Sequence, residues 1–272
     1  AFGNLFAGMM PGWFADLLNI PVNSAQSYQM VLLASVLLGL FALIPIYVLK
    51  EPDSKRDSDW KPAGQFVLLK QAIRKPLTLK LILPEMLLGF GAAITIPYMN
   101  LYFVETFQLE SNKLGQLFSL GSLFVGVGSI LGPKLVQIYR SKIKVVVLTQ
   151  SISIIFLLIL AFSPFAWFAA IGYLLRGMLM NMATPLYNAF CMERVEEYEQ
   201  GVINSLISNS WTAGWAIGPF LSGLIQLNYG FKPLFIATAS IYCLSILSTW
   251  VFFHKMDQPE KVEQAIVEGP HV

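Results

Sequence analysis

Long apolar stretches separated by short polar turns dominate the sequence, and they restrict the fold more than any other feature. A helix that spans a bilayer needs about 20 consecutive apolar residues. Seven stretches meet this length, and an eighth is slightly shorter. We therefore expect an all-α, polytopic transmembrane bundle of about eight helices, one of them partial. The expected helices cover residues 1–18, 28–49, 81–104, 116–139, 143–163, 166–189, 202–227 and 231–253.

The composition excludes a soluble globular protein. Of the 272 residues, 56% are hydrophobic and 12% are charged, and the mean hydropathy is +0.62. Soluble domains usually carry about 25% charged residues. Lipid must therefore solvate much of the surface, which makes the bilayer a partner, and no nucleic-acid partner is expected. Cys191 and Cys243 lie in separate apolar stretches, and we expect both to remain free thiols.

The distribution of basic residues predicts the orientation. If residues 50–80 are cytoplasmic, fifteen Lys and Arg side chains fall in cytoplasmic segments, and only Lys113 and Lys232 fall outside. Such an excess is typical of the cytoplasmic side of a membrane protein. We expect a multi-pass protein of the cell membrane (inner or plasma membrane), with residues 50–80 and the C-terminus in the cytoplasm.

Polar segments divide the chain into four parts. Residues 1–49 hold one full and one partial helix. Residues 50–80 form a basic linker with apolar residues at helical spacing, either an amphipathic helix on the membrane surface or a solvated linker. Residues 81–254 contain six apolar stretches and are expected to form a six-helix bundle. Residues 255–272 are polar, contain two prolines and are predicted to be a disordered tail.

One motif lies in the stretch 202–227. Residues 214–223 read GWAIGPFLSG and resemble the GxxxGPxxGG pattern of the major facilitator superfamily. That family places the pattern in its fifth helix, and here it falls in the pseudo-repeat, the eleventh. The resemblance implies a role in helix packing and gating for Gly214, Gly218, Pro219 and Gly223.

Two further segments resemble the same superfamily. Residues 132–142 stand where the family repeats its GxLaDRxGRR loop, and they keep Gly132 and trailing basic residues that include Arg140. The acidic position and the second glycine of that loop are not kept. Residues 193–201, ERVEEYEQG, resemble the family's turn between helices 10 and 11. The resemblance covers nearly the whole chain.

The resemblance implies a function. In this superfamily two six-helix halves rock around a central substrate site, so the chain resembles the segment from the end of helix 5 through helix 12. Helices 1 to 4 are then missing, and the chain is expected to be a fragment. We expect a secondary active transporter for a small-molecule substrate, with proton coupling and a lean towards efflux of small amphipathic compounds. The alternatives are a nutrient and proton symporter of the same superfamily, or a truncated membrane protein without transport activity.

Arg176 is the most unusual residue within an apolar stretch. It lies about 15 Å into the helix that begins at Ala166, which is close to the membrane midplane. A cation at that depth costs about 2.5–3.5 kcal/mol, so it normally faces a cavity or an acidic partner. We interpret its helix face as a substrate or ion pathway, with a structural ion pair or inter-helix hydrogen bonding as the alternative. The polar residues on or beside this face are Tyr173, Arg176, Asn181, Thr184, Tyr187 and Asn188.

Glu85 is the natural acidic candidate. It lies one turn inside the helix 81–104 and shares a face with Asn100. Pro97 and other helix-weakening residues predict a break in this helix, and broken helices are common at transporter sites. Glu85 is a candidate proton carrier; alternatively, it pairs with Lys80 or Arg176.

The helix 202–227 adds Asn204, Trp211 and Trp215 on or near one arc. The two indoles are candidates for an aromatic wall of the pathway, and ordinary helix packing is the alternative. The sequence contains no HExxH, GxSxG or phosphate-binding Gly-Lys-Ser/Thr motif. We therefore expect no catalytic residues, no metal site, no cofactor and no enzymatic activity.

Overall fold

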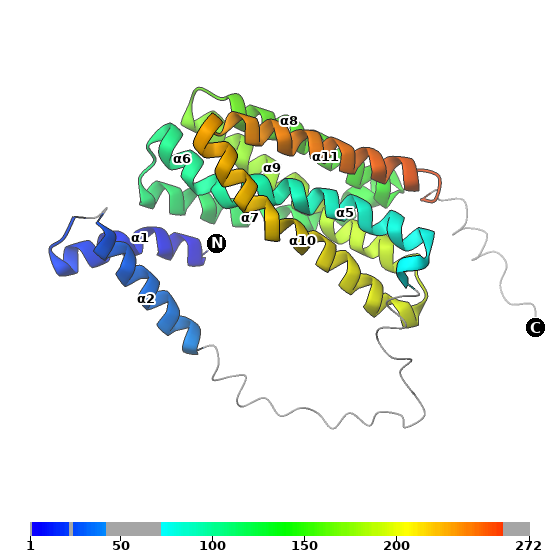
Figure 1. The fold of residues 1–272 in the computed structure, drawn as a ribbon, viewed down its shortest axis with the longest axis horizontal. Coiled ribbons are helices and arrows are strands. Elements are labelled where there is room, and N and C mark those ends of the chain that lie inside the picture. Colours follow the sequence, from blue (N-terminus) through cyan, green and yellow to red (C-terminus); the bar gives the residue numbers. More distant parts are fainter. Residues whose placement is uncertain (1, 22–23, 42–71, 258–272) are drawn as a thin grey trace, which may run out of the picture. The chain divides into compact units, whose positions relative to one another are not determined.

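The computed structural model describes residues 2–21, 24–41 and 72–257 (Figure 1). Within these ranges the chain is helical and contains no strand. The helices are α1 (Phe2–Leu18), α2 (Ala25–Phe41), α5 (Pro76–Thr95), η1 (Ile96–Tyr98), α6 (Met99–Phe107), α7 (Ser111–Tyr139), α8 (Lys142–Phe162), α9 (Ala166–Glu193), α10 (Glu197–Tyr229) and α11 (Lys232–Phe253).

A helix occupies each of the eight predicted positions, which confirms the all-α class. The predicted residues 42–49 of the second helix, the linker from residue 50 to residue 71 and the tail from residue 258 lie outside the described residues. Within the described ranges, four helical segments are long and apolar enough to cross a membrane. They are Pro76–Phe107, Ser111–Tyr139, Lys142–Phe162 and Lys232–Phe253.

The helix that begins at Pro76 breaks where Pro97 predicts it. α5 ends at Thr95, one turn of 3-10 helix follows, and α6 resumes at Met99. Proline cannot donate the backbone hydrogen bond that an α-helix needs at this point. The break is linked to α10, since the hydroxyl of Tyr98 in the 3-10 turn donates a hydrogen bond of 2.9 Å to the carbonyl of Pro219.

The chain forms two compact units. The first contains α1, α2 and the segment Leu109–Leu120. In this unit α1 lies directly against the start of α7, because a Cβ added to Gly8 would lie 2.7 Å from the Cα of Gly115. The hydroxyls of Tyr28 and Ser111 are 2.6 Å apart.

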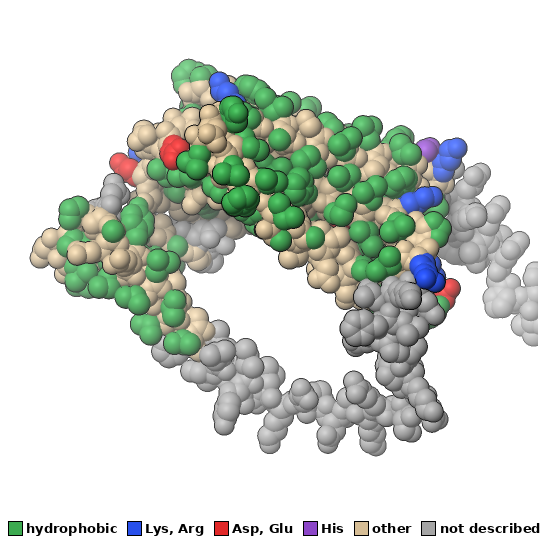
Figure 2. All heavy atoms as spheres, in the orientation of Figure 1, with side chains coloured by type: hydrophobic (Ala, Val, Ile, Leu, Met, Phe, Trp, Pro, Cys, Tyr) green, Lys and Arg blue, Asp and Glu red, His purple; other side chains and the backbone are tan. Residues whose placement is uncertain are grey.

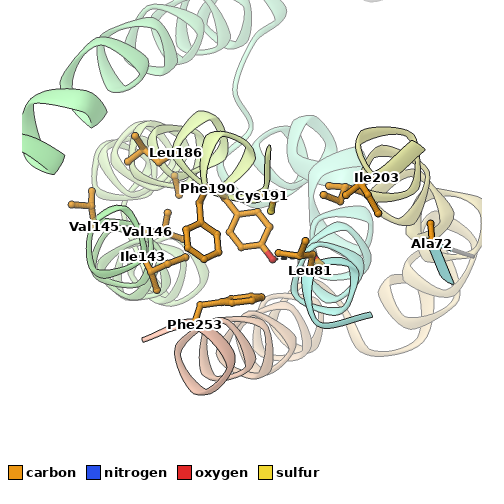
Figure 3. Packing of buried hydrophobic residues seen from close by; sticks show 13 residues of the cluster. Ala72, Leu81, Ile143, Val145, Val146, Leu186, Phe190, Cys191, Ile203 and Phe253 are labelled. Atoms are coloured by element: carbon orange, nitrogen blue, oxygen red, sulfur yellow. Dashed lines mark hydrogen bonds between the residues drawn. The ribbon is translucent and has the colours of Figure 1, made fainter. Parts of the chain in front are cut away.

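The second unit contains α5, η1, α6, α8 to α11 and the rest of α7. α9 packs on α8, and α5 packs on both α10 and α11. Figure 3 shows side chains from these helices converging on an apolar cluster around Phe190 and Phe253, whose ring centroids are 5.2 Å apart. Lipid is as apolar as these side chains, so close packing rather than escape from water holds them together.

Glycines let α5 and α10 approach until their backbones touch. A Cβ added to Gly89 would lie 2.5 Å from the Trp211 carbonyl oxygen. A Cβ on Gly214 would lie 2.6 Å from the Cα of Phe90, and one on Gly218 would lie 2.5 Å from the Cβ of Ala93. Larger residues at these three glycines would therefore force the two helices apart.

The remaining motif residues occupy different surroundings. A Cβ added to Gly223 would lie 2.7 Å from the Tyr98 hydroxyl, again between α10 and the broken helix. Gly132 of α7 packs on α9, because its Cβ would lie 3.1 Å from the Met182 carbonyl oxygen. Arg140 ends α7 with a φ of 49° and an exposed side chain.

Basic side chains gather at one end of the second unit (Figure 2). The ends of its helices meet there, since Lys142 at the start of α8 pairs with Glu193 at the end of α9. Asp257, just after α11, accepts a hydrogen bond of 2.6 Å from the backbone N–H of Ile143. Lys75 before α5 pairs with Glu199 of α10 at 2.6 Å. Arg140, Arg194 and Lys255 belong to the same helix ends.

Candidate functional site

An open polar cavity of about 300 Å³ lies in the second unit, between α5, α9 and α10, and most of its lining side chains are exposed. α5 contributes one side chain to its wall, α9 contributes three and α10 contributes four. The lining residues are Glu85, Asn181, Thr184, Asn188, Asn204, Ile207, Ser208 and Trp211.

Helical periodicity places these residues on the cavity wall. Asn181, Thr184 and Asn188 follow one another at spacings of three and four residues on α9, so they share one face. Asn204 and Trp211 lie two turns apart on the same face of α10. The close approach of Trp211 to α5 at Gly89 brings this face of α10 beside the helix that carries Glu85.

Glu85 is the charged group of the cavity. Its side chain is 8% exposed, and it forms no hydrogen bond or ion pair in the part of the chain that the structure describes. Neither partner considered from the sequence binds it: Lys80 lies 6.0 Å from the centroid of the Phe252 ring, and Arg176 bonds to Tyr242. A carboxyl group in this position is free to exchange a proton or to bind a ligand that carries a donor or a positive charge.

Amide and hydroxyl groups supply the remaining polarity. The Asn181 amide donates to the Gly177 carbonyl at 2.9 Å, and its side-chain oxygen remains available as an acceptor. Asn188 and Asn204 add two exposed amides that can donate and accept. Trp211 and Ile207 add apolar surface, so the cavity combines an acid, neutral polar groups and an aromatic face.

Arg176 and Tyr187 lie in the helical bundle and do not line this cavity. Arg176 is 5% exposed, and its Nη2 donates to the Tyr242 hydroxyl of α11 at 2.9 Å. The Tyr187 hydroxyl donates to the Leu81 carbonyl at 2.9 Å, the bond drawn as a dashed line beside Leu81 in Figure 3. The arc on α9 is wide enough that one edge faces the cavity while the other faces α5 and α11.

Three more candidates from the sequence also lie away from the cavity. Tyr173 packs edge-to-face on Phe103, with ring centroids 5.9 Å apart. Asn100 is exposed on α6, and its side-chain oxygen accepts a bond from the next backbone N–H at 2.8 Å. Trp215 lies one turn beyond Trp211 on α10, and its indole nitrogen is buried without a hydrogen-bond partner among the described residues.

The cavity contains two residues that were not among the sequence candidates. Ile207 and Ser208 lie between Asn204 and Trp211, at spacings of three and four residues. The periodicity that placed Asn204 and Trp211 on one face also places Ile207 and Ser208 there. A search restricted to polar residues does not select an isoleucine. Within the described ranges, no group of three or more His, Cys, Asp and Glu side chains is placed to hold a metal ion.

An all-helical bundle with segments long enough to cross a membrane, and with a polar cavity between its helices, defines an integral multi-pass membrane protein. The family model described as Major Facilitator Superfamily matches residues 1–219. The chain belongs to this superfamily.

Similar proteins carry the name Multidrug resistance protein MdtG. The protein of Enterobacter lignolyticus (strain SCF1) is 26% identical over 179 residues, and that of Rahnella sp. (strain Y9602) is 26% identical over 178. The protein of Yersinia enterocolitica is 25% identical over 179 residues. Each match covers 64% of this chain and 42% of the relative, so the chain spans less than half the length of these relatives.

Proposed function

We propose that the protein is part of a secondary active transporter that exports small amphipathic compounds, and that the cavity forms one wall of the substrate pathway. Membership of the superfamily supports transport, and the relatives named for multidrug resistance support export. The observation that carries the proposal is Glu85, a buried carboxyl group in a polar cavity between three helices, with no hydrogen bond or ion pair to the described residues.

The cavity suits an amphipathic ligand. Trp211 and Ile207 offer apolar surface, while Asn188 and Asn204 offer hydrogen bonds that fix orientation. None of the lining residues that the structure describes is cationic. A ligand with a positive or hydrogen-bond-donating group would therefore meet its complement at Glu85.

Proton coupling follows from competition at Glu85. A carboxylate without a cationic neighbour is costly in a membrane, so it is stabilised either by a proton or by the ligand. Exchange of the two as the cavity alternates between the sides of the membrane would couple proton entry to export. In this mechanism Glu85 binds the proton and the ligand in turn, and the lining amides and Trp211 bind the rest of the ligand.

The transporting unit includes more than the described bundle in this proposal. The chain covers 42% of its relatives, and the superfamily places substrate between two six-helix halves. Helices 1 to 4 of the full-length parent would supply most of the opposite wall. The basic end of the second unit would lie on the cytoplasmic side of the cell membrane, as its positive charge predicts.

The test is proton-driven transport by the full-length parent in proteoliposomes. We expect Glu85→Gln to abolish accumulation driven by a pH gradient while substrate exchange at equal pH persists, because glutamine keeps the shape but carries no exchangeable charge. Glu105→Gln is the matched control, since Glu105 is exposed on α6 and does not line the cavity. Unchanged gradient-driven transport by Glu85→Gln would contradict the proton role.

Growth assays separate export from its rival, nutrient uptake by proton symport. Export predicts tolerance of toxic amphipathic compounds in cells that express the parent. Growth on a sole nutrient without such tolerance would contradict export. Reconstitution of the 272-residue chain alone tests the third alternative, a truncated protein without transport activity. If the chain alone moves no substrate, only the full-length parent can be the transporter.

A further inference from the structure

Four buried polar atoms have no hydrogen-bond partner among the described residues, and three of them belong to α8 and α9. These three are Gln150 Oε1 and Ser153 Oγ on α8 and Arg176 Nε on α9. Their residues are 4%, 0% and 5% exposed. Buried polar groups are almost always hydrogen-bonded. Three unsatisfied polar atoms on a single pair of packed helices therefore suggest a common partner.

The helix register places Ser153 and Arg176 at one depth, and Gln150 lies one turn further along α8. A Cβ added to Gly172 would lie 2.9 Å from the Phe156 carbonyl oxygen and 3.0 Å from the Leu160 N, so Gly172 lies opposite those residues. A short turn joins α8 to α9, and the two helices run antiparallel. Arg176 lies one turn after Gly172 on α9. Because the helices are antiparallel, the residue opposite Arg176 lies about one turn before Phe156 on α8, which is the position of Ser153.

Gln150 shares a face with Ser153, because the two residues are three apart on α8. Both side chains are buried, and α8 packs against α9 and α11. Ser153 thus lies on a buried face of α8 at the level where Arg176 projects from α9, and Gln150 lies on the same face one turn further along.

We propose that a water molecule binds inside the bundle between α8 and α9 and bridges these three atoms. The water accepts a hydrogen bond from the Nε–H of Arg176, donates to Gln150 Oε1 and bonds to the Ser153 hydroxyl. Buried waters typically make about three hydrogen bonds to groups that would otherwise be unsatisfied. The site and its water are independent of the transport proposal, since none of these residues lines the cavity around Glu85.

The donor and acceptor types favour water over an anion. An anion would bind the Arg176 Nε–H but would face the lone pairs of Gln150 Oε1, which is an acceptor. Water satisfies both because it donates and accepts. With the bond from Arg176 to Tyr242, the water completes a polar connection across α8, α9 and α11. The water thus hydrates the Arg176 cation, which forms no ion pair with a carboxylate among the described residues.

Radiolytic hydroxyl-radical labelling of the purified chain tests the site, because radicals formed at internal waters modify the buried side chains beside them. We expect labelling of Tyr242, bonded to Arg176, to exceed that of Tyr102 severalfold. Tyr102 is a matched control: it is 3% exposed against 1% for Tyr242, and its hydroxyl donates to the Leu160 carbonyl at 2.6 Å. Equal labelling of the two tyrosines would overturn the proposal.

The variants Ser153→Ala and Gln150→Met locate the water. Each removes one of its partners while keeping a similar volume, so labelling at Tyr242 should fall towards the level of Tyr102. Labelling at Tyr102 should stay unchanged, which shows that the fold is intact. Undiminished labelling at Tyr242 in both variants would contradict a water held by α8. The comparison in the unaltered chain stands even if a variant does not fold.

Discussion

Arg176 and Tyr242 are joined by a hydrogen bond of 2.9 Å from the guanidinium Nη2 of α9 to the hydroxyl of α11. The guanidinium carbon also lies 5.8 Å from the centroid of the tyrosine ring. A ring face and a hydroxyl thus replace the carboxylate that a membrane-embedded cation usually meets. Arg176 therefore ties α9 to α11, the inter-helix hydrogen bonding that was the alternative to a place in the pathway.

Removing the hydroxyl should destabilise the bundle. We expect Tyr242→Phe to lower the free energy of unfolding by about 1.5–3 kcal/mol, because a buried hydrogen bond from a charged donor is lost. Unfolding of the purified protein in detergent measures this change. Tyr229→Phe is the control, since Tyr229 is 76% exposed at the end of α10. Equal effects of the two substitutions would show that the hydroxyl of Tyr242 contributes nothing.

The contact between α5 and α10 predicts opposite results for two glycines of one helix. Gly218→Ala would place a Cβ 2.5 Å from that of Ala93, so we expect a loss of about 1–3 kcal/mol from overpacking. Gly201→Ala meets nothing within 4 Å and should be neutral or stabilising by up to about 1 kcal/mol. Thermal unfolding of both variants decides the matter; a Gly218→Ala protein as stable as Gly201→Ala would refute close packing as the reason for the motif.

The indole of Trp211 should contribute to ligand binding if the cavity is the substrate site. We expect Trp211→Ala in the full-length parent to weaken the apparent affinity for an exported compound about tenfold, equivalent to about 1.4 kcal/mol. Trp167→Ala is the control, because Trp167 is 58% exposed at the start of α9. Concentration dependence of transport gives both affinities. Unaltered affinity in Trp211→Ala would remove Trp211 from the binding wall.

The length of the apolar runs was sufficient to predict the helices, but not where each one ends. The run at 166–189 continues as helix to Glu193, and the run at 202–227 begins at Glu197. The extra turn of α10 is polar, and the extra turn of α9 ends at Glu193, which pairs with Lys142. Hydrophobicity marks where lipid contacts the chain, whereas hydrogen bonding sets the helix ends.

Polarity at helical spacing was sufficient to select six of the eight cavity residues, including Glu85 and Asn204. It could not separate them from Arg176 and Tyr187, because spacing gives a helix face but not the neighbour that the face meets. That neighbour depends on which helices pack together, and contacts such as Gly89 with the Trp211 backbone depend on the tertiary fold. The break after Thr95 was predictable, because the effect of Pro97 is local.

The ion pair between Lys75 and Glu199 predicts a dependence of stability on alkaline pH. Lys75 Nζ donates to both oxygens of Glu199, at 2.6 and 2.7 Å, just before α5 begins. The hydrogen bond that Lys75 donates to Glu199 raises the pKa of Lys75 above its usual 10.5 in the folded protein. A raised pKa means that folding favours the protonated lysine, so the pair stabilises the fold fully below about pH 10.5. The stabilisation is lost as pH rises through the folded-state pKa of Lys75.

Lys75→Met isolates this contribution, because it removes the charge and leaves Glu199 in place. We expect the variant to melt below the unaltered protein by a constant margin from about pH 7 to about pH 10. Above that range the margin should shrink, since a neutral Lys75 leaves Glu199 as unpaired as the variant does. Lys144→Gln controls for net charge, because Lys144 is exposed on α8 and forms no ion pair with the described residues. A margin that stays constant into strongly alkaline solution would mean that the pair adds packing and not charge.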